Sequence, residues 1–167
     1  MTGPRVVLIG PPGAGKTTVG KALAARHGLE FRDTDEDIEV RADKSVSEIF
    51  VDEGEATFRT LERQAVELAL REHEGVLAVG GGAVLDETTR ARLAGHTVVF
   101  LDVGLTAAVE RTGLNHARPL LAVPNPRATL KRMLDERRPV YVDAASAIVA
   151  TDNRTVEDVA AEIDALI

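Results

Sequence analysis

The chain has 167 residues, of which 44% are hydrophobic and 28% charged, as expected for a single globular domain with a buried core. It contains no cysteine and four scattered histidines, which excludes a disulfide scaffold and a thiol nucleophile and argues against a zinc site. The net charge of -7 and the absence of tryptophan argue against a nucleic-acid partner. No apolar run approaches the ~20 residues of a membrane span, and the run at 6–9 is too short for a signal peptide. We therefore expect a cytoplasmic monomer with neither a membrane nor a nucleic-acid partner.

Short β-branched runs alternate with longer helical patterns along the whole chain. Strands are expected at 6–9, 29–32, 76–79, 97–101 and 147–150. Helices are expected at 16–26, 55–72, 87–93, 106–111, 127–138 and 156–167, and Pro139 should help to end the fifth of these. Ser45 with Glu48 forms a capping-box pattern that predicts one further helix start. The alternation predicts an α/β fold with a mainly parallel sheet and with ligands at the carboxyl ends of its strands.

The first strand leads into a glycine-rich turn, Gly10-Pro-Pro-Gly-Ala-Gly-Lys-Thr17, which matches the phosphate-loop pattern G-x-x-x-x-G-K-[ST] and opens a helix. Glycines keep side chains away from the backbone N–H groups that wrap phosphate oxygens, and the helix start adds its positive end. Lys16 is expected to reach the β- and γ-phosphates, and the Thr17 hydroxyl to ligate Mg²⁺. The sequence lacks the Asn-Lys-x-Asp pattern of guanine recognition, so ATP is the favoured nucleotide.

Two aspartates, Asp33 and Asp35, follow the second strand. In an extended segment, residues i and i+2 point the same way, so both carboxylates can face one site while Thr34 faces the other side. One carboxylate could serve a magnesium ion and the other could orient an acceptor hydroxyl. Alternatively, one of them only caps the helix expected at 36–41. Asp102, at the end of the fourth strand, is an alternative candidate for the metal role. We expect either the Asp33–Asp35 pair or Asp102 to take that role, and the other to take no part in metal binding.

Three consecutive glycines, Gly80 to Gly82, end the third strand. They imply either a close approach of the backbone to a ligand or an unusual turn. The segment 112–126 holds three prolines and joins two helices, so we expect it to be an irregular lid, and Arg118 within it could close on a transferred phosphate.

Two further arginines are candidates for anion binding. Arg59 follows Glu55 by four residues and precedes Glu62 by three, a spacing that equally suits surface ion pairs. Arg137 could bind an anion or could complement the negative end of its helix. From the residues alone, both interpretations of each arginine stay open.

Together these features resemble the shikimate kinase family. The resemblance rests on six motifs in order along nearly the whole chain: Gly13-Ala-Gly-Lys-Thr-Thr18, Asp33-Thr34-Asp35, Gly54-Glu55 with Phe58-Arg59, Gly80-Gly-Gly-Ala83, Arg118-Pro-Leu120 and Arg137-x-Pro139-x-Tyr141. It implies a three-layer α/β/α P-loop kinase fold like that of nucleoside monophosphate kinases, with a five-stranded parallel sheet and a mobile lid. The chain would be one domain, 1–167, with its substrate-binding region at about 35–62 and its lid at about 112–126.

The resemblance also implies ATP-dependent phosphorylation of the 3-hydroxyl of shikimate, with Mg²⁺ as cofactor. It assigns catalysis to Lys16, Asp35 and Arg118, and magnesium binding to Thr17 and Asp33, so it favours Asp33 over Asp102. Nucleotide binding falls to Gly13, Ala14, Gly15, Lys16, Thr17, Thr18, Arg111, Arg118 and Arg154. Shikimate binding falls to Asp35, Phe50, Phe58, Arg59, Glu62, Gly80, Gly81, Gly82 and Arg137.

Two alternatives are less well matched. The first is another P-loop kinase acting on a small polyol acid or a nucleotide, such as a gluconate kinase-like enzyme. The second is a nucleotide-binding regulator without catalysis, although every catalytic position is filled.

Overall fold

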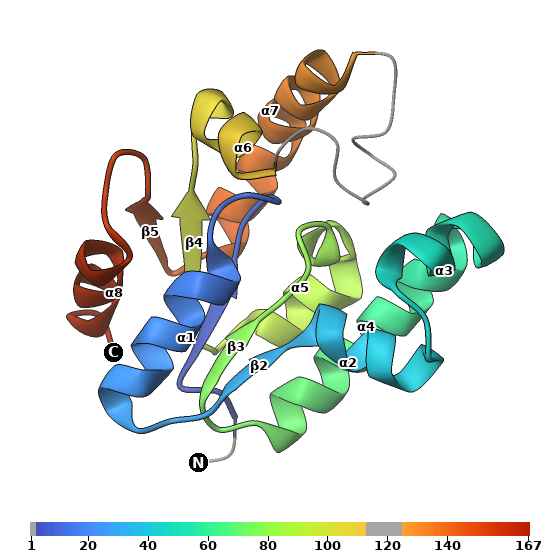
Figure 1. The fold of residues 1–167 in the computed structure, drawn as a ribbon. Coiled ribbons are helices and arrows are strands. Elements are labelled where there is room, and N and C mark those ends of the chain that lie inside the picture. The colour runs from blue at the N-terminus through green and yellow to red at the C-terminus, as the bar shows by residue number, and fades with distance from the viewer. Residues whose placement is uncertain (1–2, 113–124) are drawn as a thin grey trace.

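The structure, a computed structural model, describes residues 3–112 and 125–167. Within these residues, five parallel strands form one sheet in the order β2-β3-β1-β4-β5 (Figure 1). The strands are β1 (Val6–Ile9), β2 (Phe31–Asp33), β3 (Val76–Ala78), β4 (Val98–Asp102) and β5 (Ala147–Ala150). The α/β class and the five predicted strands are therefore confirmed, with shifts of one or two residues at some strand ends.

The central position of β1 in the sheet explains why all its residues are apolar, rather than every second one. β1 lies between β3 and β4, with Val7 opposite Leu77 on one side and Val98 on the other. All four residues of β1 are 0% exposed, because helices cover both faces of the sheet.

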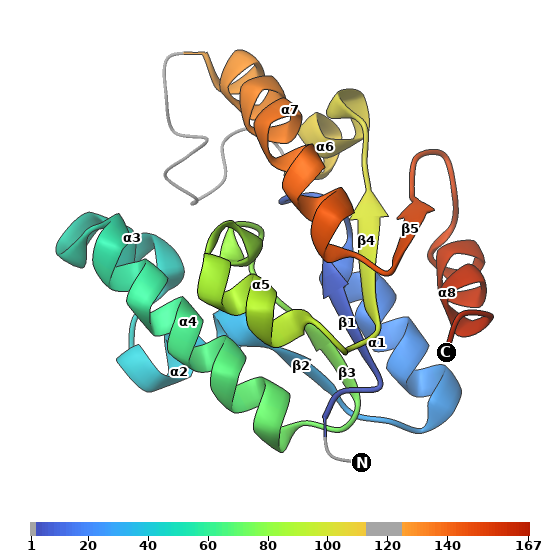
Figure 2. The same cartoon turned by 180° about the vertical axis from the view of Figure 1, so that it is seen from behind.

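Helices flank the sheet in two layers. They are α1 (Lys16–His27), α2 (Thr34–Ala42), α3 (Val46–Glu53), α4 (Glu55–Glu72), α5 (Glu87–Leu93), α6 (Leu105–Thr112), α7 (Pro126–Ala144) and α8 (Val156–Asp164), with a short 3-10 helix, η1 (Ala83–Leu85). One core cluster joins α1 and α8 to one face of the sheet, and a second joins α4 and α5 to the opposite face. Figures 1 and 2 show these two layers from opposite sides.

The helices α2 and α3 extend beyond the edge of the sheet. Their apolar residues pack on α4 in a third, separate cluster that includes Ile38, Ile49 and Phe58. The α3 helix begins with the predicted capping box, since the Ser45 hydroxyl accepts a bond from the backbone N–H of Glu48 and the Glu48 carboxylate accepts one from the backbone N–H of Ser45. The helices α2 and α3 thus lie together beside the carboxyl ends of the strands.

Pro139 does not end its helix, contrary to our expectation, because α7 continues to Ala144. A proline inside a helix loses one bond to the carbonyl four residues earlier, here that of Asp135. Beyond the proline, however, Tyr141 is 1% exposed and stacks on Phe100 with ring centroids 5.0 Å apart. Burial of this aromatic side chain offsets the lost backbone bond.

The expected irregular segment is shorter at both ends than predicted. Thr112 is the last residue of α6, where its hydroxyl donates to the Ala108 carbonyl, and Pro126 is the first residue of α7, after the capping residue Asn125. The remainder, 113–124, lies outside the described residues. In the part of the chain that is described, no helix has both the length and the apolar composition that a membrane crossing requires.

Candidate active site

The phosphate loop lies at the carboxyl end of β1 and runs into α1, as predicted. Gly13 and Gly15 have φ angles of 84° and 90°, which residues with a side chain rarely adopt. Lys16 folds over its own loop, where its Nζ donates to the carbonyls of Gly10 and Pro11 at 2.7 and 3.1 Å. The loop is thus shaped for an anion, with its lysine beside the backbone cradle.

A cavity of about 380 Å³ lies over this loop and brings it together with the aspartate pair. It is lined by Pro12, Gly13, Gly15, Lys16, Thr17, Thr18, Asp33, Asp35, Val79, Arg111 and Thr112. We call it the P-loop cavity. Carboxyl ends of parallel strands meet at one edge of a sheet, and only β3 separates β1 from β2 there, which is why segments so distant in sequence line one cavity.

Asp33 and Asp35 differ in backbone conformation. Asp33 ends β2 and caps α2, since its Oδ1 accepts from the backbone N–H of Asp35 at 2.9 Å, and its Oδ2 accepts from the Thr17 hydroxyl at 3.2 Å. Asp35 lies in the first turn of α2, so the predicted extended segment is wrong. Both carboxylates still line the P-loop cavity, while Thr34 is buried. Capping and a place in the site are therefore compatible for Asp33.

Burial raises the pKa of the Asp33 carboxyl, and the negative charge of Asp35 raises it further. The bonds from Asp35 and Thr17 and the charge of Lys16 act in the opposite direction. The pair therefore concentrates negative charge in a partly buried place, an environment that a cation would stabilise.

Asp102 does not line the P-loop cavity. Its Oδ2 accepts a bond from Arg138 Nη2 at 2.9 Å, and both side chains line a different cavity of about 240 Å³ between β4 and α7. An arginine partner already compensates this carboxylate, whereas Asp33 faces Thr17 of the phosphate loop.

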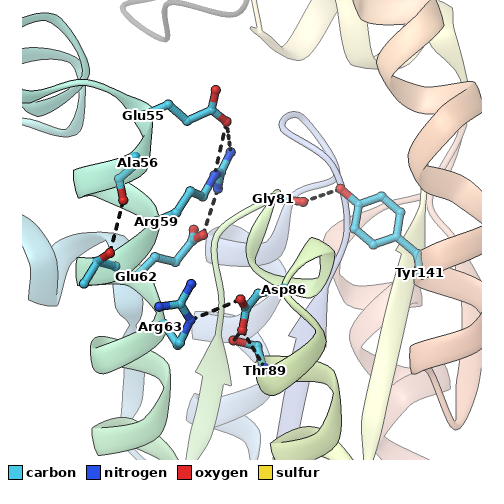
Figure 3. Close-up of polar contacts among 10 residues, drawn as sticks. Glu55, Ala56, Arg59, Glu62, Arg63, Gly81, Asp86, Thr89 and Tyr141 are labelled. Atoms are coloured by element: carbon cyan, nitrogen blue, oxygen red, sulfur yellow. Dashed lines mark hydrogen bonds and ion pairs between the residues drawn. The ribbon is translucent and has the colours of Figure 1, made fainter.

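Arg59 makes the ion pairs that its spacing predicts (Figure 3). Its Nη1 donates to Glu62 Oε1 at 2.8 Å, and its Nη2 to Glu55 Oε2 at 3.3 Å. Burial alone lowers the pKa of Arg59, but the carboxylates of Glu62, 3% exposed, and Glu55 together outweigh it and leave the pKa raised. Phe50 and Phe58 pack beside this guanidinium, whose carbon lies 5.9 and 5.3 Å from their ring centroids. Four of the predicted shikimate-binding side chains therefore gather on α3 and α4.

The three glycines after β3 pass very close to this group. A Cβ on Gly80 would lie 2.5 Å from Glu62 Oε2 and 2.8 Å from Asp35 Oδ1, and one on Gly82 would lie 2.5 Å from Arg59 Nη1. The glycines thus make close approaches to side chains of this chain itself, and the predicted approach to a ligand stays a prediction. Any larger residue would push these side chains out of place.

Arg137 is 8% exposed and sits on α7 one turn before Tyr141. The positive charges of Arg137 and Arg59 and the negative charge of Glu62 all act on the buried Tyr141 hydroxyl. The two predicted substrate arginines, from α4 and α7, thus lie near one another around the glycines.

A smaller cavity of about 240 Å³ adjoins the phosphate loop and shares Gly15, Thr18 and Arg111 with the first. Arg154, predicted to bind the nucleotide, lines it but donates to the Ala150 carbonyl and to Glu162. Arg111 links its walls, because it donates to the Gly13 carbonyl at 3.1 Å and to the hydroxyl and carbonyl of Thr151. Arg118 lies outside the described residues.

Thr151 and Tyr141 are among the described residues at the site that were not predicted to act there. Thr151 lines the smaller cavity and accepts both Arg111 bonds, and no sequence signal marks a threonine that follows an edge strand. Tyr141 belongs to a motif that the sequence analysis singled out, yet no role followed from its position in the motif.

A phosphate loop facing a pair of carboxylates, on a parallel sheet of order 2-3-1-4-5 with arginines gathered nearby, defines a P-loop kinase that acts on a small acceptor. Residues 12–167 match the family model described as shikimate kinase. The chain belongs to the shikimate kinase family.

Relatives of known name agree with this assignment over almost the full chain. The chain is 63% identical to shikimate kinase of Salinispora arenicola over 164 residues, which cover 98% of each chain. It is 58% identical to shikimate kinase of Streptomyces coelicolor, with 99% of this chain and 97% of the relative covered.

Solved structures show the same fold. The shikimate kinase from Acinetobacter baumannii in complex with shikimate superposes with a TM-score of 0.92 at 38% identity, covering 99% of this chain and 93% of that one. The shikimate kinase of Aquifex aeolicus gives a TM-score of 0.79 at 32% identity, with 96% and 94% covered. The predicted three-layer P-loop kinase fold is therefore confirmed.

Proposed function

We propose that the protein transfers the γ-phosphoryl group of ATP to the 3-hydroxyl of shikimate, giving shikimate 3-phosphate and ADP. The observation that carries the proposal is one connected site. Lys16 and Asp35 both line the P-loop cavity. The Asp35 carboxylate lies beside Gly80, and Gly82, two residues further on, lies beside Arg59 of α4. Membership of the shikimate kinase family supports the same substrate.

The nucleotide phosphates would occupy the phosphate loop. Backbone N–H groups from Gly13 to Thr18 would hold their oxygens, and Lys16 would leave the loop carbonyls to contact the transferred phosphate. The smaller adjoining cavity, with Arg111 and Arg154 in its lining, would take the base. Because phosphoryl transfer passes through a loose transition state, alignment and positive charge supply most of the barrier reduction.

Magnesium fits the oxygen ligands present. Thr17 and Asp33 lie in hydrogen-bond contact inside the P-loop cavity, and magnesium in kinases is held by one or two such groups together with phosphates and water. When bound, the ion would neutralise charge on the β- and γ-phosphates. It would also offset the crowding of negative charge that raises the pKa of Asp33.

Shikimate would bind between the glycines, α4 and α7. Two guanidinium groups, Arg59 and Arg137, would hold its carboxylate, since planar forked donors match a carboxylate better than lysine does. Asp35 would orient the reacting hydroxyl and accept its proton late, because an alcohol is too weak an acid to ionise before attack. The aromatic pair Phe50 and Phe58, with Glu62, would keep Arg59 in place.

Arg118 would add positive charge to the transferred phosphate from the segment after α6. This role rests on the family motif, as does the lid itself. A monomer and a cytoplasmic location stay predictions, and light scattering on the purified protein would test the first through the mass of one chain.

The direct test compares ADP release with shikimate, gluconate and nucleoside monophosphates at equal concentrations. We expect turnover with shikimate to exceed that with every other acceptor. A shikimate rate no higher than the gluconate rate would instead favour a gluconate kinase-like enzyme. Normal ATP affinity with negligible turnover of all acceptors would favour a regulator without catalysis.

A further inference from the structure

Tyr141 connects α7 to the glycines after β3. Its hydroxyl donates to the Gly81 carbonyl at 2.5 Å (Figure 3). Its ring is 1% exposed and stacks on Phe100. A carbonyl can only accept, so the phenol must be protonated for this bond to exist. Burial raises the pKa of Tyr141, while the charge of Arg137 lowers it, and the net upward direction keeps the hydroxyl a donor at neutral pH.

The bond fixes the peptide between Gly81 and Gly82. The C=O and N–H of a trans peptide point in opposite directions, so holding the Gly81 carbonyl toward Tyr141 turns the Gly82 N–H away from it. The same short segment touches two other elements. A Cβ on Gly81 would lie 3.0 Å from Pro12 of the phosphate loop, and one on Gly82 would lie 2.5 Å from Arg59 Nη1. Glycines lack side chains that would restrict them, so an outside hydrogen bond has a large effect on their orientation.

Tyr141 also lies four residues after Arg137, which is one helical turn. Pro139 stands between them and removes one bond of the helix ladder, so α7 is weakest where the arginine must be placed. The tyrosine therefore holds both the helix that carries Arg137 and the glycines opposite Arg59.

Building on the proposed function, we infer that Tyr141 is a positioning residue for the acceptor. Its hydroxyl sets the orientation of the Gly81–Gly82 peptide and the distance from α7 to the glycines, and thereby the spacing of Arg59 and Arg137 around the shikimate carboxylate. A core role alone would require the ring but not the hydroxyl, so the two roles separate in Tyr141→Phe.

The kinetic test measures Tyr141→Phe beside wild type and Leu93→Ala. Leu93 is 2% exposed in the same core cluster, and its truncation lowers stability without touching the glycines. We expect Tyr141→Phe to raise the KM for shikimate about tenfold, the equivalent of one hydrogen bond, and to change the KM for ATP less than about twofold. Leu93→Ala should change neither. Unchanged shikimate kinetics in a folded Tyr141→Phe protein would overturn the inference.

A second measurement needs no variant. The sequence has one tyrosine and no tryptophan, so intrinsic fluorescence excited in the absorption band of tyrosine reports on Tyr141 alone. Saturation of the wild type with shikimate should change this emission, whereas acetate at the same ionic strength should not. If Tyr141→Phe fails to fold, unresponsive emission overturns the inference by itself. Absence of shikimate turnover in the wild type would instead refute the proposed function.

Discussion

Arg137 and Arg138 are neighbours on α7 but have different surroundings. Arg137 is buried near the glycines, whereas the side chain of Arg138 is 56% exposed and paired with Asp102. A buried charge is costly unless a partner or a ligand compensates it, while an exposed ion pair contributes little. Arg137 and Arg138 therefore provide a proposed binding residue and a matched control in adjacent positions.

Arg137→Ala should raise the KM for shikimate about 10- to 100-fold, because a hydrogen bond to a charged group contributes ~1.5–3 kcal/mol. The KM for ATP should change less than about twofold, since Arg137 does not line the P-loop cavity. Arg138→Ala should leave both constants nearly unchanged. Steady-state kinetics with each substrate varied in turn measure the KM values for shikimate and ATP of both variants. Equal losses for ATP and shikimate would show that Arg137 acts elsewhere.

Lys16→Met should lower kcat about 10²- to 10³-fold, by analogy with the loss of one oxyanion donor, worth ~2.7–4 kcal/mol. The reason is that the proposed role of the Nζ charge at the transferred phosphate would be lost while the loop backbone remains. Lys21→Met is the control, because Lys21 is an exposed residue of the same helix. Coupled ADP release measures both variants, and a Lys16→Met rate within tenfold of wild type would contradict the assigned role.

At the scale of elements, the glycines depend on the helices around them. Asp86 caps α5, where its carboxylate accepts from the Thr89 backbone N–H at 2.9 Å and from Arg63 of α4 at 3.1 Å (Figure 3). Partial burial acts to raise the pKa of Asp86, but the bonds from Thr89 and Arg63 outweigh it, so the pKa is lowered. One charged side chain thus joins α4 to the helix that follows the glycines.

Asp86→Ala should lower the free energy of unfolding by ~1 kcal/mol near neutral pH, the usual value of a lost helix cap. Because the folded pKa lies below the unfolded value of about 3.9, the charged cap stabilises the protein above about pH 4. This stability is lost as the pH falls through the folded pKa. Urea unfolding of wild type and variant across this range measures the difference. A difference that grows toward acidic pH would refute the assignment.

For the whole molecule, the P-loop cavity and the smaller cavity adjoin one another, since Gly15, Thr18 and Arg111 line both. A ligand that binds these cavities in the folded state alone stabilises the whole fold by mass action. At 100 times its dissociation constant the gain is ~2.7 kcal/mol, which for a chain of this size raises Tm by about 5–10 °C.

ADP with Mg²⁺ should produce this rise in a thermal unfolding experiment. Removal of the metal by a chelator should reduce the rise, because the proposed site at Thr17 and Asp33 would then lack the cation that offsets the phosphate charge. Lys16→Met should reduce it as well. An equal rise with and without metal would argue against a magnesium site at Thr17 and Asp33.

The residue patterns predicted the elements well where a signal is local. The span of α4 and the glycine-rich loop into α1 follow from helical periodicity and from one motif. Pro139 and Asp35 were predicted wrongly for different reasons. In α7, the local preference for helix termination was outweighed by a contact far along the chain, the stacking of Tyr141 on the Phe100 ring. At Asp35, the helix begins two residues earlier than expected, because the Asp33 carboxylate accepts from the backbone N–H of Asp35 and caps α2 at Thr34.

The sequence by itself was enough to determine the order of elements, the phosphate loop and the family, because periodicity and motifs are properties of neighbouring residues. Tertiary structure alone decided that Asp102 is paired with Arg138 while Asp33 faces Thr17, and that Tyr141 reaches Gly81. These contacts join residues 16 to 60 positions apart, and only the stacking of strands and helices brings such residues to one edge of the sheet.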